Sequence, residues 1–465
     1  MKTKILSVFF SFILIVGLLS GCYHFTPLTG GPLANDLVTG NGGSAVVKGD
    51  YLYFMNGYLS VDDLTEGDND YGDEENGALY RAELNTDGSL MTDEEGNLLN
   101  VELLVPKLVG FENGGIYIFD NYIYYASPTI LKDKAGDVRF DLVDFYRAKL
   151  DGTGITKIYA TNAYDDGSEF AFYKIDGSVY LVVFDGTSVV SVKVGSSVSS
   201  PVTMVETATS VILPKVTTYD ATNNVVADIN KYVYYTRDLD SAVDNTIIDS
   251  GNVLAKVQIG ATTEQVLMRD NIWTYSLGNL KNSALYYTKY SSNSSSSKNY
   301  FRIIENGSLS STEVQVTGTY YSSITVLDFA NGNNRGVVVS DGNRLLLITD
   351  ITTTEGIEIL VDEEATLLFG KGDYVYYAHG DNNRIARINI ITKVIDELSA
   401  EDETINVDSS LKIDYDDNYI YFLQTHTNEA GDSIYLERVQ ISTTAFESEF
   451  VGVLESDDLP DEVTE

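Results

Sequence analysis

The fold is decided by a short stretch near the C-terminus, residues 365–398, ATLLFGKGDYVYYAHGDNNRIARINIITKVIDEL. It reads as four consecutive β-strands, at residues 365–369, 374–378, 384–390 and 393–398. Gly, Asp and Asn separate these runs, and such residues favour tight turns for steric and hydrogen-bonding reasons. The stretch therefore predicts a unit of four short strands joined by turns.

The same pattern recurs from residue 43 to residue 454. The second strands of the units begin near residues 51, 122, 179, 232, 284, 336, 374 and 419. A mean step of about fifty residues is typical of propeller blades. These strands are apolar on both alternating faces, as Tyr374 to Tyr377 illustrate, which indicates that neighbouring sheets cover both sides. Blades packed face to face around an axis provide such cover.

We therefore expect an all-β fold, a single β-propeller of eight four-stranded blades over residues 43–454. Seven blades is the second choice, because the unit at 323–362 is plain and the junction of the third and fourth units is loosely patterned. Two packed β-sandwich domains are the structural alternative. Residues 455–465, ESDDLPDEVTE, are expected to form a disordered acidic tail.

Composition limits the partners of the chain. The 465 residues carry a formal net charge of −39. A field of this sign repels phosphate backbones, which disfavours nucleic-acid binding and admits cationic partners or divalent metal ions. The 33 tyrosines suit half-buried strand surfaces, where the ring packs and the hydroxyl reaches a partner or water.

The N-terminus carries an export pattern. Lys2 and Lys4 precede an apolar run at residues 5–19, which ends in Leu-Ser-Gly-Cys at residues 19–22. This ending resembles the lipobox of bacterial lipoproteins, and the resemblance implies cleavage before Cys22 and attachment of palmitate-type acyl chains to it. We expect a signal peptide at 1–21, a lipidated tether at 22–42 and a location on the outer face of a bacterial membrane. Because Cys22 is the only cysteine, disulfides within the chain are excluded.

One further resemblance comes from the second and third strands of the units. Residues 122–125, YIYY, and 145–152, FYRAKLDG, are echoed at 51–54 and 79–84. The combination resembles the uncharacterised, low-density-lipoprotein-receptor-like β-propeller domains of bacterial surface proteins. The resemblance implies a propeller fold and an extracellular setting. It offers no catalytic residues, because the motif is structural.

The loops between second and third strands are long and acidic in several units, and all such loops leave a propeller on one face. They are expected at 57–77, 128–143, 239–251, 291–298 and 425–432. Asp68, Asp70, Asp73 and Glu75 form the densest cluster, and carboxylates suit Ca²⁺. Their spacing departs from that of the EF-hand loop, so a solvated loop is the default and a Ca²⁺ site is the alternative.

Two histidines fall in equivalent loops of adjacent units. His379 lies near Asp381, and His426 lies near Asp432. These four residues are the candidate binding set, as a shared metal or acid–base site, with ordinary loop residues as the alternative.

No nucleophile-elbow, zinc-protease, P-loop or dinucleotide-binding motif is present. The sequence therefore favours a non-enzymatic, membrane-anchored binding propeller for a protein, peptide or glycan, and it leaves the question of catalysis open. The alternatives are an extracellular carbohydrate-active hydrolase or lyase that uses loop carboxylates, and an envelope-assembly scaffold. A pair of buried acids with raised pKa values at the mouth of the central channel would favour the enzyme.

Overall fold

A computed structural model provides the structure of this chain. It describes residues 36–61, 76–94, 96–112, 114–129, 131–132, 138–139, 142–161, 168–216, 219–240, 244, 251–278, 284–290, 297–305, 308–311, 313–317, 325–328, 337–340, 343–348, 357–380, 384–398, 413–427, 432–441 and 448–453. No helix within this described part combines the length and hydropathy that a bilayer crossing demands.

Four antiparallel sheets form the first half of the fold. Sheet 1 contains β1 (Val38–Thr39), β2 (Ala45–Lys48), β3 (Tyr51–Met55), β4 (Leu79–Glu83) and β5 (Val101–Val105). Sheet 2 contains β6 (Tyr117–Phe119), β7 (Tyr122–Pro128), β10 (Val143–Lys149) and β11 (Thr156–Ala160), with the hairpin β8 (Leu131–Lys132) and β9 (Val138–Arg139) inserted after β7. Sheet 3 contains β12 (Glu169–Ile175), β13 (Ser178–Phe184), β14 (Val189–Val194) and β15 (Val202–Val205). Sheet 4 contains β16 (Ser210–Ile212), β17 (Tyr232–Asp238), β18 (Asn252–Gln258) and β19 (Glu264–Asp270), with the short 3₁₀-helix η2 (Asp228–Lys231) before β17.

Four more sheets form the second half. Sheet 5 contains β20 (Ile272–Gly278), β21 (Ala284–Tyr290), β22 (Ser297–Glu305), β23 (Ser308–Leu309) and β24 (Val314–Thr317). Sheet 6 contains β25 (Thr325–Asp328), β26 (Val337–Ser340), β27 (Leu345–Ile348) and β28 (Ile357–Val361). Sheet 7 contains β29 (Ala365–Lys371), β30 (Tyr374–His379), β31 (Arg384–Asn389) and β32 (Ile395–Glu397). Sheet 8 contains β33 (Asp414–Tyr415), β34 (Tyr419–Thr427), β35 (Asp432–Gln440) and β36 (Glu449–Val451).

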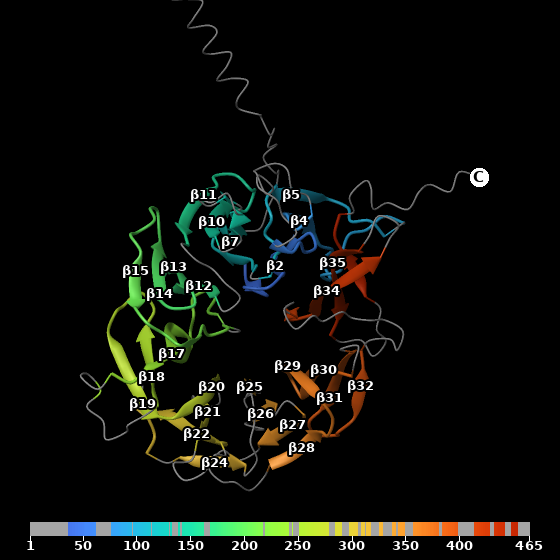
Figure 1. Cartoon of the computed structure of the whole chain (residues 1–465). Helices are drawn as coiled ribbons and strands as arrows, with labels where there is room; N and C mark the ends of the chain where they lie inside the picture. The colour runs from blue at the N-terminus through green and yellow to red at the C-terminus, as the bar shows by residue number, and fades with distance from the viewer. Residues whose placement is uncertain are drawn as a thin grey trace, which may run out of the picture.

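The sheets stand around a common axis, with the first strand of each unit toward the centre and the last at the rim (Figure 1). The all-β propeller of four-stranded blades expected from the sequence is thus confirmed. The second strands of the described sheets begin within one residue of the positions expected from the sequence.

Two segments differ from expectation. Residues 36–42 were expected in the tether, yet β1 pairs with β2 and the Asn41 amide exchanges two hydrogen bonds with the backbone of Ile118. Residues 425–427 and Asp432 were expected in a loop, yet they extend β34 and β35, and Thr427 pairs with Asp432. The β-branched Thr425, Thr427 and Ile434 favour the extended conformation, which explains the longer hairpin.

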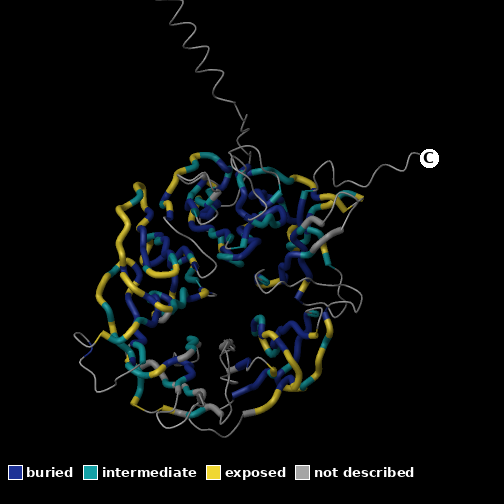
Figure 2. The backbone as a smooth tube through the Cα atoms, in the orientation of Figure 1, coloured by how far each residue is buried: buried dark blue, intermediate teal, exposed yellow. Residues whose placement is uncertain are grey.

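The hydrophobic core is divided among the interfaces between consecutive sheets. Figure 2 shows buried residues along the strands and exposed residues toward the rim. One cluster joins sheets 2 and 3 through Phe145, Phe172 and Leu181. Another joins the first and last sheets through Phe54 and Leu436. Second strands such as β3, β7 and β30 therefore bury side chains on both faces, and the chain closes into a ring by packing its ends together.

A repeated aromatic–basic contact accompanies this packing. In six sheets a basic side chain of the third strand lies over the ring of a tyrosine near the start of the second strand, which is a cation–π arrangement. The pairs, with the distance from the charged group to the ring centroid, are Arg81 over Tyr51 (4.4 Å), Arg147 over Tyr122 (4.9 Å), Lys193 over Tyr180 (5.7 Å), Lys256 over Tyr232 (4.2 Å), Arg387 over Tyr374 (4.5 Å) and Arg438 over Tyr419 (3.8 Å). The recurring Tyr and basic residues of the sequence pattern therefore have a structural role.

The four arginines of this set also reach the next sheet around the ring. In each case Nη1 donates a hydrogen bond to a backbone carbonyl that follows the third strand of the next sheet, directly in three pairs and at Gly88, in the loop beyond β4, in the fourth. The pairs are Arg81 with Leu150 (3.5 Å), Arg147 with Gly195 (2.6 Å), Arg387 with Ile441 (2.6 Å) and Arg438 with Gly88 (3.2 Å). The last of these connects sheet 8 to sheet 1, so the same device that joins neighbours also closes the ring.

Candidate functional site

A cavity of about 350 Å³ lies among the inner strands. Its walls come from β6 of sheet 2, β12 of sheet 3, residues 213–216 and 219 after β16, and Asp414 at the start of β33. Asn41 and Gly42, which follow β1, complete it. Glu169 at the start of β12 pairs with Phe184 at the end of β13, because paired strands run antiparallel. This end of the blade is also where the loops between second and third strands leave.

Aromatic rings form one wall of the cavity. Tyr117 packs at tilted angles against Phe172 and Phe170, with ring centroids 5.4 and 6.0 Å apart. Gly42 makes this approach feasible, because a Cβ there would lie 2.9 Å from the Tyr117 ring and its φ is +89°. The wall therefore offers flat apolar surface beside polar groups.

Asp414 is the buried charge of the cavity. Its Oδ2 accepts hydrogen bonds from the Ser44 backbone N–H (2.7 Å) and from Ser44 Oγ (3.0 Å). A Cβ at Gly43 would lie 2.7 Å from the Asp414 carboxyl carbon, so a glycine is needed where the two segments meet. Asp414 Oδ1 faces Lys215 Nζ at 3.6 Å, and the Lys215 side chain is 60% exposed.

Glu169 is the second carboxylate of the cavity, and it is exposed. Burial raises the pKa of Tyr117 well above its usual value, and the neighbouring Tyr219, Asp414 and Glu169 add to the shift. Burial likewise raises the pKa of Tyr173 and of Tyr219. These phenols stay neutral and can donate hydrogen bonds, but they cannot serve as bases near neutral pH.

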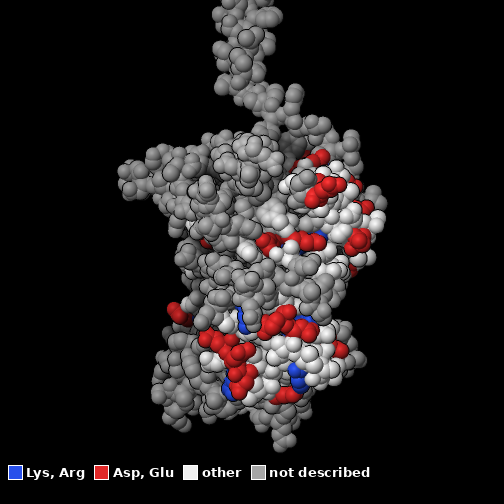
Figure 3. Space-filling model, turned by 90° about the vertical axis from the view of Figure 1, so that its right-hand side faces the viewer, with Lys and Arg blue, Asp and Glu red and all other residues white. Residues whose placement is uncertain are grey.

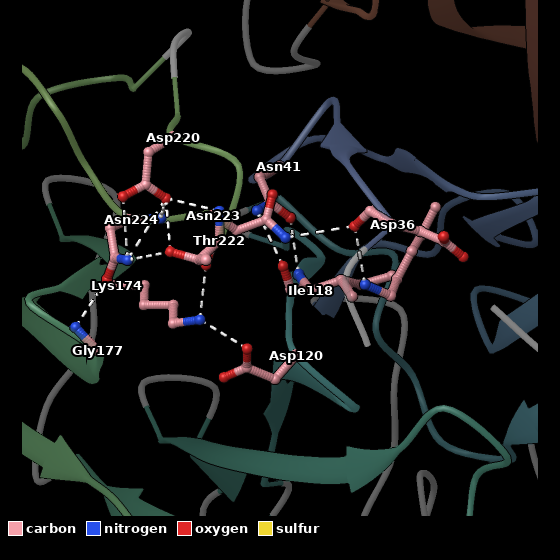
Figure 4. Close-up of polar contacts among 11 residues, drawn as sticks. Asp36, Asn41, Ile118, Asp120, Lys174, Gly177, Asp220, Thr222, Asn223 and Asn224 are labelled. Carbon is pink, nitrogen blue, oxygen red and sulfur yellow. Dashed lines mark hydrogen bonds and ion pairs between the residues drawn. The ribbon is translucent and has the colours of Figure 1, made fainter. Parts of the chain in front are cut away.

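The connection from β16 to β17, residues 213–231, lies beside the cavity and is fastened by a polar cluster (Figure 4). The Asp220 carboxylate accepts hydrogen bonds from the Asn224 backbone N–H (2.9 Å) and from the Thr222 hydroxyl and backbone N–H (both 2.8 Å), and these bonds lower the pKa of Asp220 to about 2. The buried Lys174 ammonium donates to the Thr222 carbonyl (2.7 Å) and pairs with Asp120 (2.6 Å). The connection is therefore tied to both sheet 2 and sheet 3.

The structure places only some of the residues predicted from sequence. Cys22, the Ca²⁺ candidates Asp68, Asp70, Asp73 and Glu75, and Asp381 lie outside the described residues. Among the residues that are described, no group of three or more His, Cys, Asp and Glu side chains is arranged to hold a metal ion.

His379 is the member of the histidine set whose side chain is described. It ends β30 and is buried, with Nε2 3.0 Å from Glu397 Oε2 and Nδ1 3.4 Å from Glu363 Oε1. Its contacts are therefore carboxylates of β32 and of the turn before β29. His426 and Asp432 occupy strand positions of the β34–β35 hairpin instead of the loop expected from sequence, and their side chains lie outside the description.

Asp244, one of the acids of the long loop at 239–251, forms ion pairs with two arginines. Its fully buried carboxylate accepts hydrogen bonds from Arg237 (2.9 and 3.0 Å) and from Arg269 Nε (3.2 Å). Arg237 also pairs with Glu264 at 2.8 Å. The cluster fixes Asp244 onto sheet 4. On the side of the molecule shown in Figure 3, Asp and Glu cover more of the described surface than Lys and Arg.

Sequence reasoning missed the cavity residues. Tyr117, Glu169 and Asp414 stand at the starts of inner strands of three different sheets, and no local motif connects them. The one available signal was the loosely patterned junction of the third and fourth units, where the chain needs residues 213–231 to pass from β16 to β17.

No family model matches this sequence, and no curated protein is significantly similar to it. Solved structures similar to the chain include the Dos1 propeller, at 10% identity and a TM-score of 0.44 over 90% of this chain and 97% of that one. The nidogen–laminin complex is similar at 12% identity and a TM-score of 0.31, over 55% and 91%. An oligogalacturonate lyase in complex with manganese is similar at 12% identity and a TM-score of 0.39, over 70% and 87%. Such distant similarities leave the fold assignment resting on the sheets themselves.

Proposed function

We propose that the chain is a lipid-anchored, extracellular binding propeller that takes a protein, peptide or glycan ligand at the cavity among its inner strands. The observation that carries this proposal is the cavity itself, which combines an aromatic wall with a few convergent polar groups. Concave sites of this composition are the usual places where proteins bind organic ligands. Its position at the end of the blades where the second-to-third strand loops leave agrees with a binding face there.

The carboxylates of the cavity favour binding over hydrolysis. Glycoside cleavage requires two carboxyl groups that flank the scissile bond, and the enzyme alternative predicts that both are buried at the site. Asp414 is buried and occupied by Ser44 and Lys215, whereas Glu169 is exposed. The described cavity thus lacks the pair of buried acids that the hydrolase or lyase alternative needs.

The proposed ring has eight blades. Support comes from the eight described sheets of four or five strands, which follow one another along the chain, and from the packing of sheet 8 on sheet 1. A seven-bladed ring would require two of these sheets to belong to one blade. An experimental density map at a resolution that separates strands distinguishes the two arrangements by direct count.

The anchoring part of the proposal rests on the lipobox-like residues 19–22. Metabolic labelling with a fatty acid should mark the wild-type protein and fail to mark Cys22→Ser. The variant should also leave the membrane fraction without detergent. Label retained on Cys22→Ser would refute lipidation at this residue.

Ligand binding at the cavity is tested with a matched pair of variants of the full chain, purified in detergent. Glu169→Trp places a large ring at the cavity, and Glu94→Trp makes the same change at an exposed site in the β4–β5 connection. Both variants are applied to peptide and glycan arrays beside the wild type. We expect Glu169→Trp to lose the ligands that the wild type and Glu94→Trp retain. Equal capture by all three proteins would place the binding site elsewhere.

A further inference from the structure

The cavity already contains an ammonium group of its own. Lys215 Nζ lies 3.6 Å from Asp414 Oδ1 and 5.5 Å from the centroid of the Tyr415 ring. A carboxylate and an aromatic face together make a site for an organic cation. Because the Lys215 side chain is 60% exposed, its ammonium can move into water, so another cation can take its place beside Asp414.

The position of the Asp414 carboxylate is fixed before any ligand binds. Its side chain is only 6% exposed, and the two hydrogen bonds from Ser44 keep Oδ2 in place while Oδ1 faces the cation. A carboxylate positioned in advance loses little freedom when a ligand arrives. If Lys215 swings into solvent, a buried negative charge is left without its cation, which favours uptake of another.

The charges around Asp414 also favour a cationic ligand. Glu169 adds a second carboxylate to the cavity against the single Lys215, and the whole chain carries a net charge of −39. A field of this sign concentrates cations near the molecule. The wall formed by Tyr117 and Phe170 offers apolar and π surface to the body of a ligand.

We propose that the cavity binds the ammonium group of an organic ligand with an apolar body, at Asp414 and beside the aromatic wall, with Lys215 as the exchangeable internal occupant. This inference rests on the proposed binding function and specifies its ligand class. The opposite role for Lys215 is that of an anchor for an anionic ligand. The two roles predict effects of opposite sign when the lysine is removed.

The test uses three probes with similar bodies and different charges: 2-phenylethylamine, 2-phenylethanol and 3-phenylpropanoate. Each is titrated into the full-length protein by calorimetry at neutral pH and low salt. The variants are Lys215→Met and Asp414→Asn. Lys157→Met is the matched control, because Lys157 is a half-exposed lysine paired with the largely buried Asp144 away from the cavity.

We expect the amine to bind at least tenfold more tightly than the alcohol, and the carboxylate to bind most weakly. Asp414→Asn should weaken amine binding at least tenfold. Lys215→Met should strengthen it about threefold or more, since the internal competitor is gone, and Lys157→Met should change nothing. Thermal melting of each variant establishes that it is folded. Asn retains an oxygen for Ser44, which preserves the local hydrogen bonding.

Preference for the carboxylate probe, or loss of binding in Lys215→Met, would overturn the inference. So would equal affinity for the amine and the alcohol. These results leave the proposed function standing if Glu169→Trp still abolishes capture of an array ligand. If Glu169→Trp captures as the wild type does, the proposed function fails independently of the probe titrations.

Discussion

Arg438 provides the sharpest test of how the ring is held closed. Its side chain is 1% exposed, and it lies 3.8 Å from the centroid of the Tyr419 ring. Nε donates to Glu449 Oε2 at 2.7 Å within sheet 8, and Nη1 donates to the Gly88 carbonyl of sheet 1 at 3.2 Å. The perturbation is Arg438→Met, which keeps an unbranched apolar stem and removes the guanidinium.

The magnitude follows from these contacts. Hydrogen bonds to a charged group contribute about 1.5–3 kcal/mol, and a desolvated cation–π contact contributes up to about 2 kcal/mol. Breaking a buried ion pair costs about 3–5 kcal/mol when the remaining charge stays buried. Glu449 is 45% exposed and regains water, so we expect the lower end, about 3 kcal/mol of lost unfolding free energy.

The assay is urea unfolding at equilibrium, followed by circular dichroism. Glu449→Gln is the first comparison: its amide oxygen still accepts from Nε, but the buried guanidinium loses its counter-ion, so we expect a loss of about 3 kcal/mol here as well. Arg438→Lys is the second comparison. It keeps the charge and loses the fork that reaches both partners, so an intermediate loss is expected. If Arg438→Met lowers the unfolding free energy by less than about 1 kcal/mol, the guanidinium does not hold the two ends of the ring together.

Three further perturbations test other parts of the structure. Hydrogen bonds from Arg237 hold the pKa of Asp244 well below its usual value, so the folded state binds fewer protons than the unfolded chain, and stability falls as pH drops from about 5 to about 2. Asp244→Asn should be less stable at neutral pH and lose less melting temperature across that range, and parallel wild-type and variant curves would contradict this account. Gly57→Ala places a Cβ 2.4 Å from the Ile434 carbonyl oxygen at a φ of +82°, whereas Gly96→Ala meets open space at +91°. We expect about 1 kcal/mol of destabilisation at Gly96 and at least twice that at Gly57 by urea unfolding, and equal values would show that the close approach is unimportant. Lys174→Met removes the ammonium that bonds the Thr222 carbonyl, so amide hydrogen exchange at residues 219–225 should accelerate, while Lys157→Met should leave it unchanged.

The strands were predictable because their signals are local. The Tyr374–Tyr377 run and the flanking Gly and Asx residues predict a strand and its turns within about a dozen residues. Comparable runs predict the strands of the other units. The alternation also indicated two covered faces, which is the property that makes blades stack. The YIYY and FYRAKLDG segments were visible as a pattern, yet the physical role of Arg147 needs the neighbouring sheet, since its acceptor is the Gly195 carbonyl.

The cavity was not predictable for the opposite reason. Ser44 and Asp414 are 370 residues apart, and they meet only because the ring closes. The composition of the acidic loops suggested ligand or Ca²⁺ binding. Composition does not distinguish a solvated carboxylate from a buried one such as Asp244, which lies between two arginines. The short strand β1 was not predicted, because a strand of two residues has no alternating pattern of apolar and polar side chains.

The seam between sheets 1 and 8 has a kinetic consequence. The hydrogen bonds that close it join residues 350, 370 and 397 positions apart. Contacts of such long sequence separation are slow to form. Almost the entire chain must lose conformational entropy before these contacts stabilise it. Individual sheets can form early from their own hairpins, so we expect the final docking of the two ends of the chain to limit the folding rate.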